Sequence, residues 1–210
     1  MFIELIDLLR CTRAHEESWL VATFHELRDR VVIEGMLSCP VCGARYPVTK
    51  GVAYFDVPAE QTAARGSAPA EDRSRVAAYL NLVEPGIVVL AGEWGSASTA
   101  IATLGNTVIA FNVPNAREPF ASCIRSDGML PLARESVDGV ALDSTDAVTI
   151  ESGAGALKAG ARMVAPAAAA VPAGLTELAR DERYWVAVRG GGGVSGPVQI
   201  ARGTVKNRDG

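Results

Sequence analysis

The sequence has no long hydrophobic run, and no stretch reaches the roughly 18 to 20 uninterrupted apolar residues that a bilayer crossing demands. A strong positive field is missing too, because 20 Lys and Arg are outnumbered by 24 Asp and Glu and the net charge is -4. The opening residues carry acids where a secretory signal would be basic. These absences predict a cytoplasmic protein with no membrane partner and no strong non-specific nucleic-acid binding.

Familiar catalytic motifs are absent as well. The chain contains neither the Gly-x-Ser-x-Gly of serine hydrolases nor the Gly-Lys-Ser of P-loops, and it has no internal repeat. What it does have is 210 residues that are 49% hydrophobic and 21% charged, which is enough to build a packed core and excludes an intrinsically disordered chain. Residues 58–74 begin with a stretch rich in Ala, Gly and Pro without apolar periodicity, so we expect a linker there between domains at 1–57 and 75–210.

The cysteine spacing in the first domain predicts a metal site. Cys39 and Cys42 form a Cys-Pro-Val-Cys-Gly knuckle, in which two intervening residues let both thiolates turn toward one tetrahedral ion. Cys11 and His15, four residues apart, would complete a site of three sulfurs and one nitrogen. Because protein atoms would fill all four positions, the expected zinc is structural, not catalytic.

The remaining ligand-type residues are interpreted as follows. His15 lies in a polar segment that also suits a solvated loop, and Glu16 is the alternative fourth ligand. His25 is expected at the far end of a strand and receives no role, while Cys123 reads as a core residue. The β-rich runs at 19–24 and 30–37, separated by a charged corner, predict a hairpin of zinc-ribbon type.

Several motifs in this region resemble a known family. An opening helix ends in Leu-Leu-Arg-Cys at Cys11, a hairpin follows, and the run from Glu34 continues through the knuckle to Tyr-Pro-Val and then Gly51-Val52. Residues 1–57 are thereby similar to the small zinc-ribbon activator subunit of tRNA, ribosomal-RNA and release-factor methyltransferases. The resemblance implies that this domain adds a strand to a methyltransferase-like domain of the same or a neighbouring chain. The sequence departs from the family where a second cysteine should stand near His15.

The second half alternates between strands and helices. Residues 87–91 are apolar at every position, which indicates burial on both faces, as in a parallel sheet. Further strands are expected at 108–111, 121–125, 137–142, 161–165, 184–189 and 198–201, and helices from Arg75 and at 96–104, 145–157 and 175–180. The last two strands flank a four-glycine run too short for a crossover helix, so we expect them to form an antiparallel hairpin.

This half is similar to S-adenosylmethionine-dependent methyltransferases. The segments 85–92, 126–140 and 156–164 resemble three of their motifs, and the most specific part is an acid, Asp127, followed by Leu-Pro-Leu and a Val-Asp-Gly-Val strand. The expected fold class is therefore α/β: a small α+β zinc ribbon followed by a doubly wound, mostly parallel, Rossmann-like sheet with a C-terminal antiparallel hairpin.

The resemblance implies three cofactor positions, and two of them are altered. Gly92 matches the first glycine of a Gly-x-Gly-x-Gly turn, but Trp94 stands at the second, where an indole is expected to block the crevice. Asn112 stands where the family has an acid that binds both ribose hydroxyls, and Asp127 matches the acid that contacts the adenine. Residues 112–119 contain two prolines and cannot hold the helix that normally lies there, which predicts exposed apolar surface and a homodimer.

No catalytic residue can be assigned. Asp143 and Asp146, after the fourth strand of the second half, fit a strand end and a helix N-cap better than a substrate site. We therefore expect a degenerate methyltransferase-fold pseudoenzyme that acts as a binding or scaffolding module for a protein partner or a second copy. Two alternatives stay open: an active S-adenosylmethionine-dependent methyltransferase acting on a translation component, and a zinc-stabilised adaptor for a separate methyltransferase.

Overall fold

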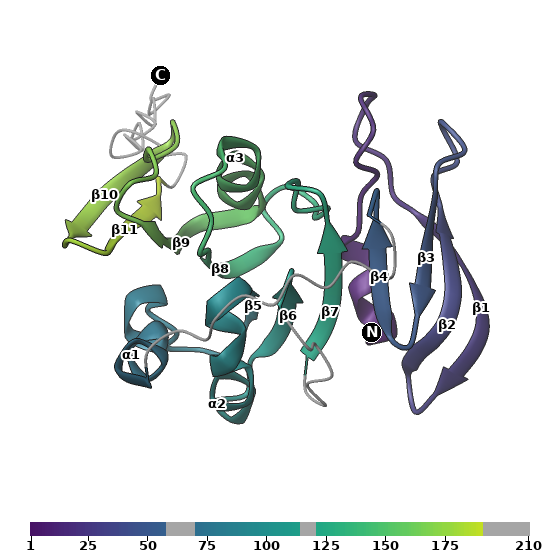
Figure 1. The fold of residues 1–210 in the computed structure, drawn as a ribbon, viewed down its shortest axis with the longest axis horizontal. Helices are drawn as coiled ribbons and strands as arrows, with labels where there is room; N and C mark the ends of the chain where they lie inside the picture. The colour runs from purple at the N-terminus through teal and green to yellow at the C-terminus, as the bar shows by residue number, and fades with distance from the viewer. Residues whose placement is uncertain (58–69, 114–120, 191–210) are drawn as a thin grey trace, which may run out of the picture.

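The computed structural model describes residues 1–57, 70–113 and 121–190. Within them a single mixed sheet of 11 strands runs through the molecule in the order β1-β2-β3-β4-β7-β6-β5-β8-β9-β11-β10 (Figure 1). The N-terminal elements are η1, a 3-10 helix at Ile3–Leu8, and the strands β1 (Val21–Arg28), β2 (Val31–Ser38), β3 (Arg45–Thr49) and β4 (Val52–Phe55).

These four strands form an antiparallel ribbon, which confirms the expected hairpin. The β1–β2 turn places Asp29 and Arg30 at φ 46° and 66°, the left-handed backbone that a two-residue hairpin turn requires. In β2, Val32, Gly35 and Leu37 are buried while their neighbours are partly exposed. Val32 and Gly35 are three residues apart because the β1–β2 register shifts between them. The opening helix is present as the single 3-10 segment η1.

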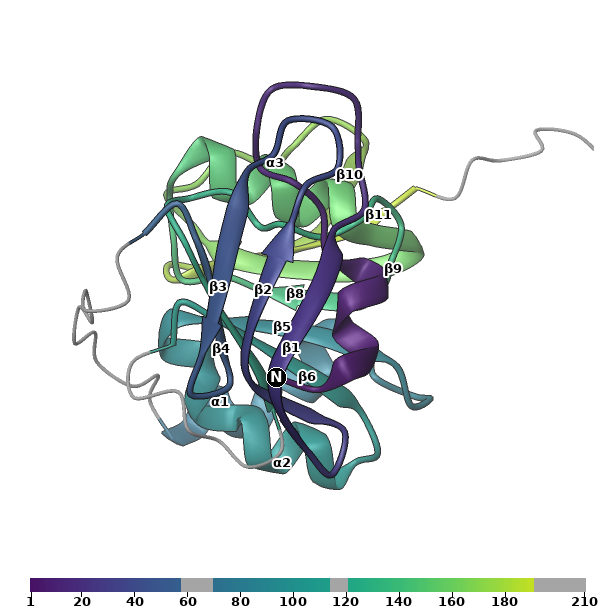
Figure 2. The same cartoon turned by 90° about the vertical axis from the view of Figure 1, so that its right-hand side faces the viewer.

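Strand β4 joins the ribbon to the rest of the sheet. It lies parallel to β7 (Ala121–Ser126), with a register that runs from Val52 opposite Cys123 to Phe55 opposite Ser126. Figure 2 shows the ribbon strands in front of the remaining sheet. The ribbon therefore docks on the second half of its own chain by adding a strand to the sheet.

The second half is an α/β unit. Its other elements are α1 (Ala70–Leu80), β5 (Ile87–Ala91), η2 (Gly92–Ala97), α2 (Ser98–Thr103), β6 (Thr107–Phe111), β8 (Val137–Ala141), α3 (Ala147–Ala156), β9 (Leu157–Pro166), β10 (Leu175–Arg180) and β11 (Tyr184–Arg189). The five strands β7-β6-β5-β8-β9 are mutually parallel. Because β6 and β7 continue on one side of β5 and β8 and β9 on the other, the sheet is doubly wound.

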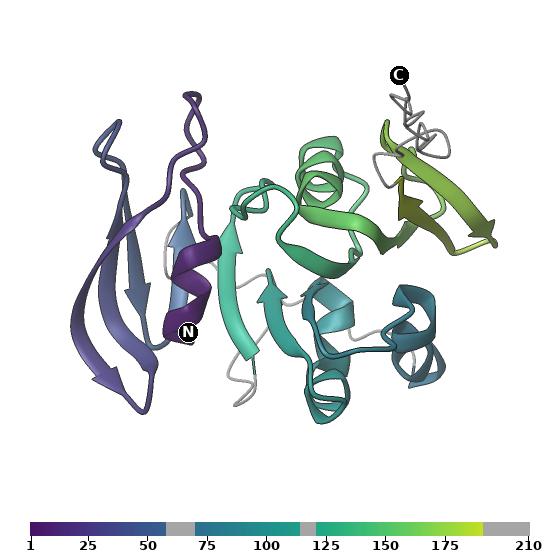
Figure 3. The ribbon, with the colours of Figure 1, turned by 180° about the vertical axis from the view of Figure 1, so that it is seen from behind.

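Helices cover both faces of these central strands. Successive residues of β5 face opposite cores: Val89 packs in the core shared with η1 and α3, whereas Val88 and Leu90 pack in the core shared with α1 and α2. Seen from behind, η1 lies over the sheet beside β7 (Figure 3). None of the helices in the described parts of the chain combines the length and the hydrophobicity that a membrane crossing requires.

Some expectations need correction, and others fall on residues that are not described. The helix expected at 175–180 is wrong, since these residues form β10, which pairs antiparallel with β11. An antiparallel hairpin therefore ends the sheet, but it consists of β10 and β11, and the strand expected at 198–201 lies outside the described residues. The helix expected from Arg75 begins at Ala70, inside the expected linker, and most of 112–119 is not described.

Candidate metal centre and cofactor crevice

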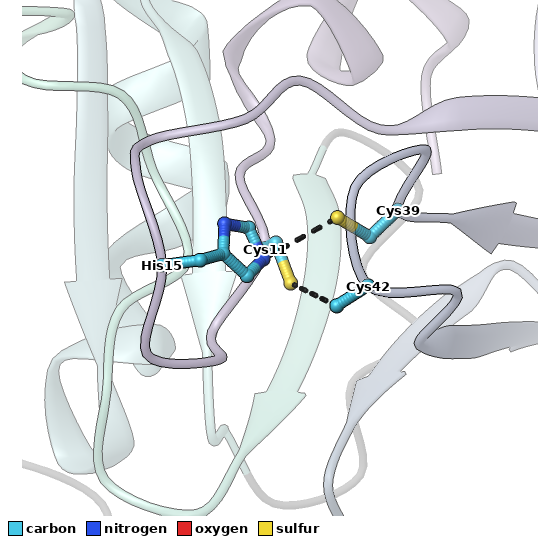
Figure 4. A group of neighbouring side chains, drawn as sticks. All are labelled: Cys11, His15, Cys39 and Cys42. Atoms are coloured by element: carbon cyan, nitrogen blue, oxygen red, sulfur yellow. Dashed lines mark hydrogen bonds between the residues drawn. The ribbon is translucent and has the colours of Figure 1, made fainter.

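Two loops bring together the four expected metal ligands. Cys11 and His15 lie between η1 and β1, and Cys39 and Cys42 lie between β2 and β3. Their ligand atoms are all within 4.8 Å of one another. Cys11 Sγ is 3.7 Å from Cys42 Sγ, and Cys39 Sγ is 3.4 Å from His15 Nε2 (Figure 4).

These distances fit a tetrahedral ion. Bonds of about 2.3 Å to sulfur and about 2.0 Å to nitrogen give tetrahedral edges of about 3.5 to 3.8 Å. His15 Nδ1 lies 2.6 Å from the backbone carbonyl oxygen of Glu16 and can only donate to it, which leaves Nε2 as the ligand atom. His15 thus joins the three cysteines, and Glu16 contributes its carbonyl to orient the ring. The four residues form a Cys3His group that can hold a metal ion such as zinc.

The surroundings tune the thiols. Burial acts to raise the pKa of Cys39, but the backbone N–H groups of Cys42 and Val41 and the neighbouring thiols outweigh it and lower that pKa to about 6. Burial raises the pKa of Cys11. A thiol must be deprotonated to ligate a metal, so Cys39 is the cysteine best prepared for it at neutral pH.

Tyr46 connects this centre to the sheet, a role that the ligand spacing did not reveal. Its hydroxyl lies 3.2 Å from Cys11 Sγ and 3.0 Å from Thr12 Oγ1, and Thr12 Oγ1 donates to Asp56 at 2.6 Å. Its ring stacks on Phe55 of β4 with centroids 4.5 Å apart. The metal loop is therefore tied to the strand that joins the two halves. The signal in the sequence was the Tyr-Pro-Val tail after the knuckle.

A separate polar crevice of about 360 Å³ lies at the carboxyl ends of β5, β6, β7 and β8. This is where ligands bind in doubly wound sheets, at the point where the strand order reverses. Of the expected cofactor residues, Asn112 and Asp127 line the crevice, whereas Gly92 does not. Asp143 and Asp146 also line it, so its walls carry three carboxylates.

Asp143 covers the glycine turn after β5. Gly92 has a φ of 50°, and a Cβ added there would lie only 1.8 Å from Asp143 Oδ2. The backbone N–H of Glu93 donates to that same carboxylate oxygen at 3.0 Å. The Asp143 carboxylate therefore occupies the space beside Gly92 that the missing Cβ leaves open.

Trp94 does not block the crevice, and that expectation is wrong. Its side chain is 1% exposed and turns into the core on the α1 and α2 face, where its indole N–H donates to the carbonyl of Leu142 at 3.1 Å. The indole packs against Tyr79 and Tyr184, with ring centroids 6.4 and 5.0 Å away. The motif position alone could not give the direction of the side chain.

Asn112 is engaged by its neighbour on β7. Its amide donates to the carbonyl of Ser126 at 2.9 Å, and its amide oxygen accepts the N–H of Ser126 at 3.0 Å. This pair of bonds holds the ends of β6 and β7 together. Asp127 is exposed at the crevice wall.

Asp146 is the N-cap of α3, as the sequence indicated. Its carboxylate accepts the backbone N–H of Thr149 at 2.8 Å and the hydroxyl of the same residue at 2.8 Å. These bonds lower the pKa of Asp146. Its hydrogen bonds explain this carboxylate without a substrate.

Comparison with known proteins gives distant structural similarities. No protein-family model matches the sequence, and no curated protein matches it. A structure described as a methyltransferase from an antibiotic biosynthesis pathway of Anabaena variabilis is similar with a TM-score of 0.38 and 16% identity over 47% of this chain and 45% of that chain, so less than half of that protein is spanned. A 1,6-didemethyltoxoflavin N1-methyltransferase of Burkholderia thailandensis is similar with a TM-score of 0.41 and 12% identity, over 58% of this chain and 78% of that chain. A protein of Escherichia coli described as a methyltransferase is similar with a TM-score of 0.43 and 15% identity, over 71% of this chain and 93% of that chain.

The similarity to methyltransferases is distant and confined to structure. The strand order and the place of the crevice are what make the α/β half a doubly wound, Rossmann-like unit.

Proposed function

We propose that this protein is a non-catalytic methyltransferase-fold protein that acts as a binding or scaffolding module, with its zinc ribbon docked on the same chain. The observation that carries the proposal is the Asp143 carboxylate against the turn at Gly92. The Glu93 N–H in this turn already donates to Asp143 and is not left for a ligand. The negatively charged Asp143 side chain occupies the space at this turn where a cofactor would contact the backbone.

Two further positions support the same conclusion. Asn112 stands where the resembled family has a carboxylate, and its amide is engaged with the backbone of Ser126, so both ribose hydroxyls find at most one remaining lone pair there. Ala91 lines the crevice at the end of β5 and has no polar side-chain atom, whereas the resembled family carries an acid just before the first glycine of the turn. Loss of a charged hydrogen-bond partner costs about 1.5 to 3 kcal/mol in binding.

The metal, in this proposal, is structural zinc held by Cys11, His15, Cys39 and Cys42. Four protein ligands leave no open position, so the ion supplies cross-linking and no substrate activation. The docking of the ribbon argues against an adaptor for a separate methyltransferase. Strand β4 is paired on both edges, with β3 and with β7, so it has no free edge for another chain.

Calorimetric titration of the zinc-loaded protein with S-adenosylmethionine and S-adenosylhomocysteine tests the proposal. We expect no saturable heat up to about 1 mM ligand, which means a binding free energy weaker than about -4 kcal/mol. Micromolar binding that disappears in Asp127→Ala but persists in Asp7→Ala would overturn the proposal in favour of an active methyltransferase. Asp7 is a matched control because it is an exposed carboxylate on η1, away from the crevice.

A further inference from the structure

A second cavity lies at the other end of the central strands. It has a volume of about 500 Å³ and borders Ile87 and Thr107, the first residues of β5 and β6, whereas the crevice described above lies at their carboxyl ends. The segment around η1 forms one wall and α2 contributes Ala102. We refer to it as the η1 pocket. Its volume falls in the range of about 300 to 1,000 Å³ that is typical of small-molecule sites.

The η1 pocket is lined mainly by apolar side chains. Its apolar lining consists of Phe2, Leu5, Leu8, Ile87, Ala102 and Ile109. Ile109 is 0% exposed and Leu5 is 5% exposed, so the floor belongs to the protein core and not to an open surface. Figure 3 shows η1 over the sheet beside β7.

Backbone contacts fix η1 on the sheet. The N–H of Phe2 donates to Ser122 Oγ at 2.9 Å, and the N–H of Ala133 donates to the carbonyl of Leu8 at 2.8 Å. Leu9 forms an isolated β-bridge with Leu132. Both ends of the helix are therefore anchored to the second half, and the pocket is formed before any ligand arrives.

The polar and charged residues of the lining are Glu4, Asn106, Thr107 and Ser122. The Asn106 amide accepts the N–H of Gly86 and donates to the carbonyl of Ile101, and Thr107 lies at the exposed rim, so Ser122 and Glu4 decide the choice of ligand. Ser122 is 1% exposed, and because its oxygen accepts the N–H of Phe2, its own hydroxyl proton is left for an acceptor on a ligand.

Glu4 lies at the exposed rim and is the charged residue of the lining. The lining contains no Lys, Arg or His. The Glu4 carboxylate is already ion-paired with Arg30. An anionic ligand would therefore leave water without meeting a cation in the lining, so the site disfavours acids.

We propose that the η1 pocket binds a small uncharged molecule with an apolar body and one hydrogen-bond acceptor, such as an alcohol or a carbonyl compound. The apolar body fills the space between η1, β6 and α2, and the acceptor meets the Ser122 hydroxyl. This site is independent of the crevice and of any methyl transfer.

Octan-1-ol and octanoate serve as probes of equal chain length and different charge. Methyl resonances of Leu5, Leu8, Ile87 and Ile109 are followed by NMR during titration of the full-length, zinc-loaded protein. We expect saturable shifts of these resonances with octan-1-ol and at least tenfold weaker binding of octanoate. Octanoate that binds as tightly as octan-1-ol would overturn the proposal.

A matched pair of α2 variants tests the location. Ala102→Phe places a ring in the pocket and is expected to weaken octan-1-ol binding at least tenfold, whereas Ala100→Phe, on the same helix but exposed and outside the lining, is expected to leave it unchanged. Thr107→Trp, at the exposed rim, is the second variant should Ala102→Phe not fold. Binding that persists in the folded pocket variant overturns the proposal, as do shifts that never saturate. Resonances that move with protein concentration alone would also overturn it, because the occupant would then be a second copy of the chain.

Discussion

The two histidines of the chain have different surroundings. His15 places Nε2 3.4 Å from Cys39 Sγ, while His25 is exposed on β1, the outermost strand of the ribbon. Sequence spacing left Glu16 open as the fourth ligand, and the structure brings the His15 ring to the cysteines instead. Spacing could identify the knuckle because two cysteines separated by two residues can turn toward one ion. It could not predict the path of the loop that carries His15 and Glu16.

At this scale we expect His15→Ala to lower zinc affinity at least about tenfold, because losing a ligand should cost at least as much as losing an outer-shell partner. His25→Ala is the matched control and should bind zinc like the wild type. Metal content and competition with a chromogenic chelator measure both variants. Equal affinity in the two variants would remove His15 from the site.

Other residues show where a single sequence is silent. Gly92, Asn112 and Asp127 were identified by their positions in a resembled motif, yet the motif did not reveal that Asp143 covers the glycine turn. It also misplaced Trp94, whose indole finds a carbonyl partner and two aromatic rings in the core. Side-chain direction depends on neighbours far apart in the sequence, and spacing along one chain does not contain it.

At the scale of elements, α3 depends on its N-cap. Asp146→Ala removes the acceptor for the first-turn N–H of Thr149 and should lower the melting temperature by about 2 to 4 °C near neutral pH. Asp127→Ala, an exposed carboxylate in the same crevice that caps no helix, is the control and should change the melting temperature by less.

The cap also gives a pH dependence with a defined sign. Hydrogen bonds from Thr149 hold the pKa of Asp146 below its unfolded value of about 3.9. The stabilisation is therefore complete above that unfolded pKa and is lost as the pH falls through the lower folded pKa. The difference in melting temperature between the wild type and Asp146→Ala should shrink below about pH 4. A difference that stays constant down to pH 2 would contradict the assignment.

Strand prediction succeeded where burial was two-sided and failed at an edge. The apolar run at 87–91 predicted a strand buried on both faces, and β5 has those bounds. Residues 175–180 are mostly good helix formers, but β10 is an outer strand whose residues are largely exposed, so pairing with β11 decides its conformation. Local propensity could not anticipate that partner.

At the scale of the whole molecule, the ribbon and the α/β half share one sheet and the core on its η1 and α3 face. Residues of the ribbon such as Leu37 and Phe55 belong to the same core as Val89 and Ile150. Zinc bound to the ribbon should therefore stabilise residues far from it. At 100 times its dissociation constant the metal adds about 2.7 kcal/mol, roughly 5 to 10 °C for a chain of this size.

The three tryptophans allow a direct measurement. Trp94 and Trp185 are buried in the α/β half, and Trp19 is the tryptophan of the ribbon, so Trp19→Phe leaves probes of the distant half alone. We expect their fluorescence to report one unfolding transition whose midpoint falls when a chelator removes the metal. A midpoint that chelation does not move would mean that the two halves unfold independently.

The parallel pairing of β4 with β7 also has a consequence for stoichiometry. A ribbon made as a separate subunit would be divided among its partner domains by competition, according to concentration and affinity. Here the ribbon and its docking strand belong to one polypeptide, and their pairing uses the edge through which the ribbon would otherwise be exchanged. Every copy of the α/β half is thus made with its own ribbon, in a fixed one-to-one ratio.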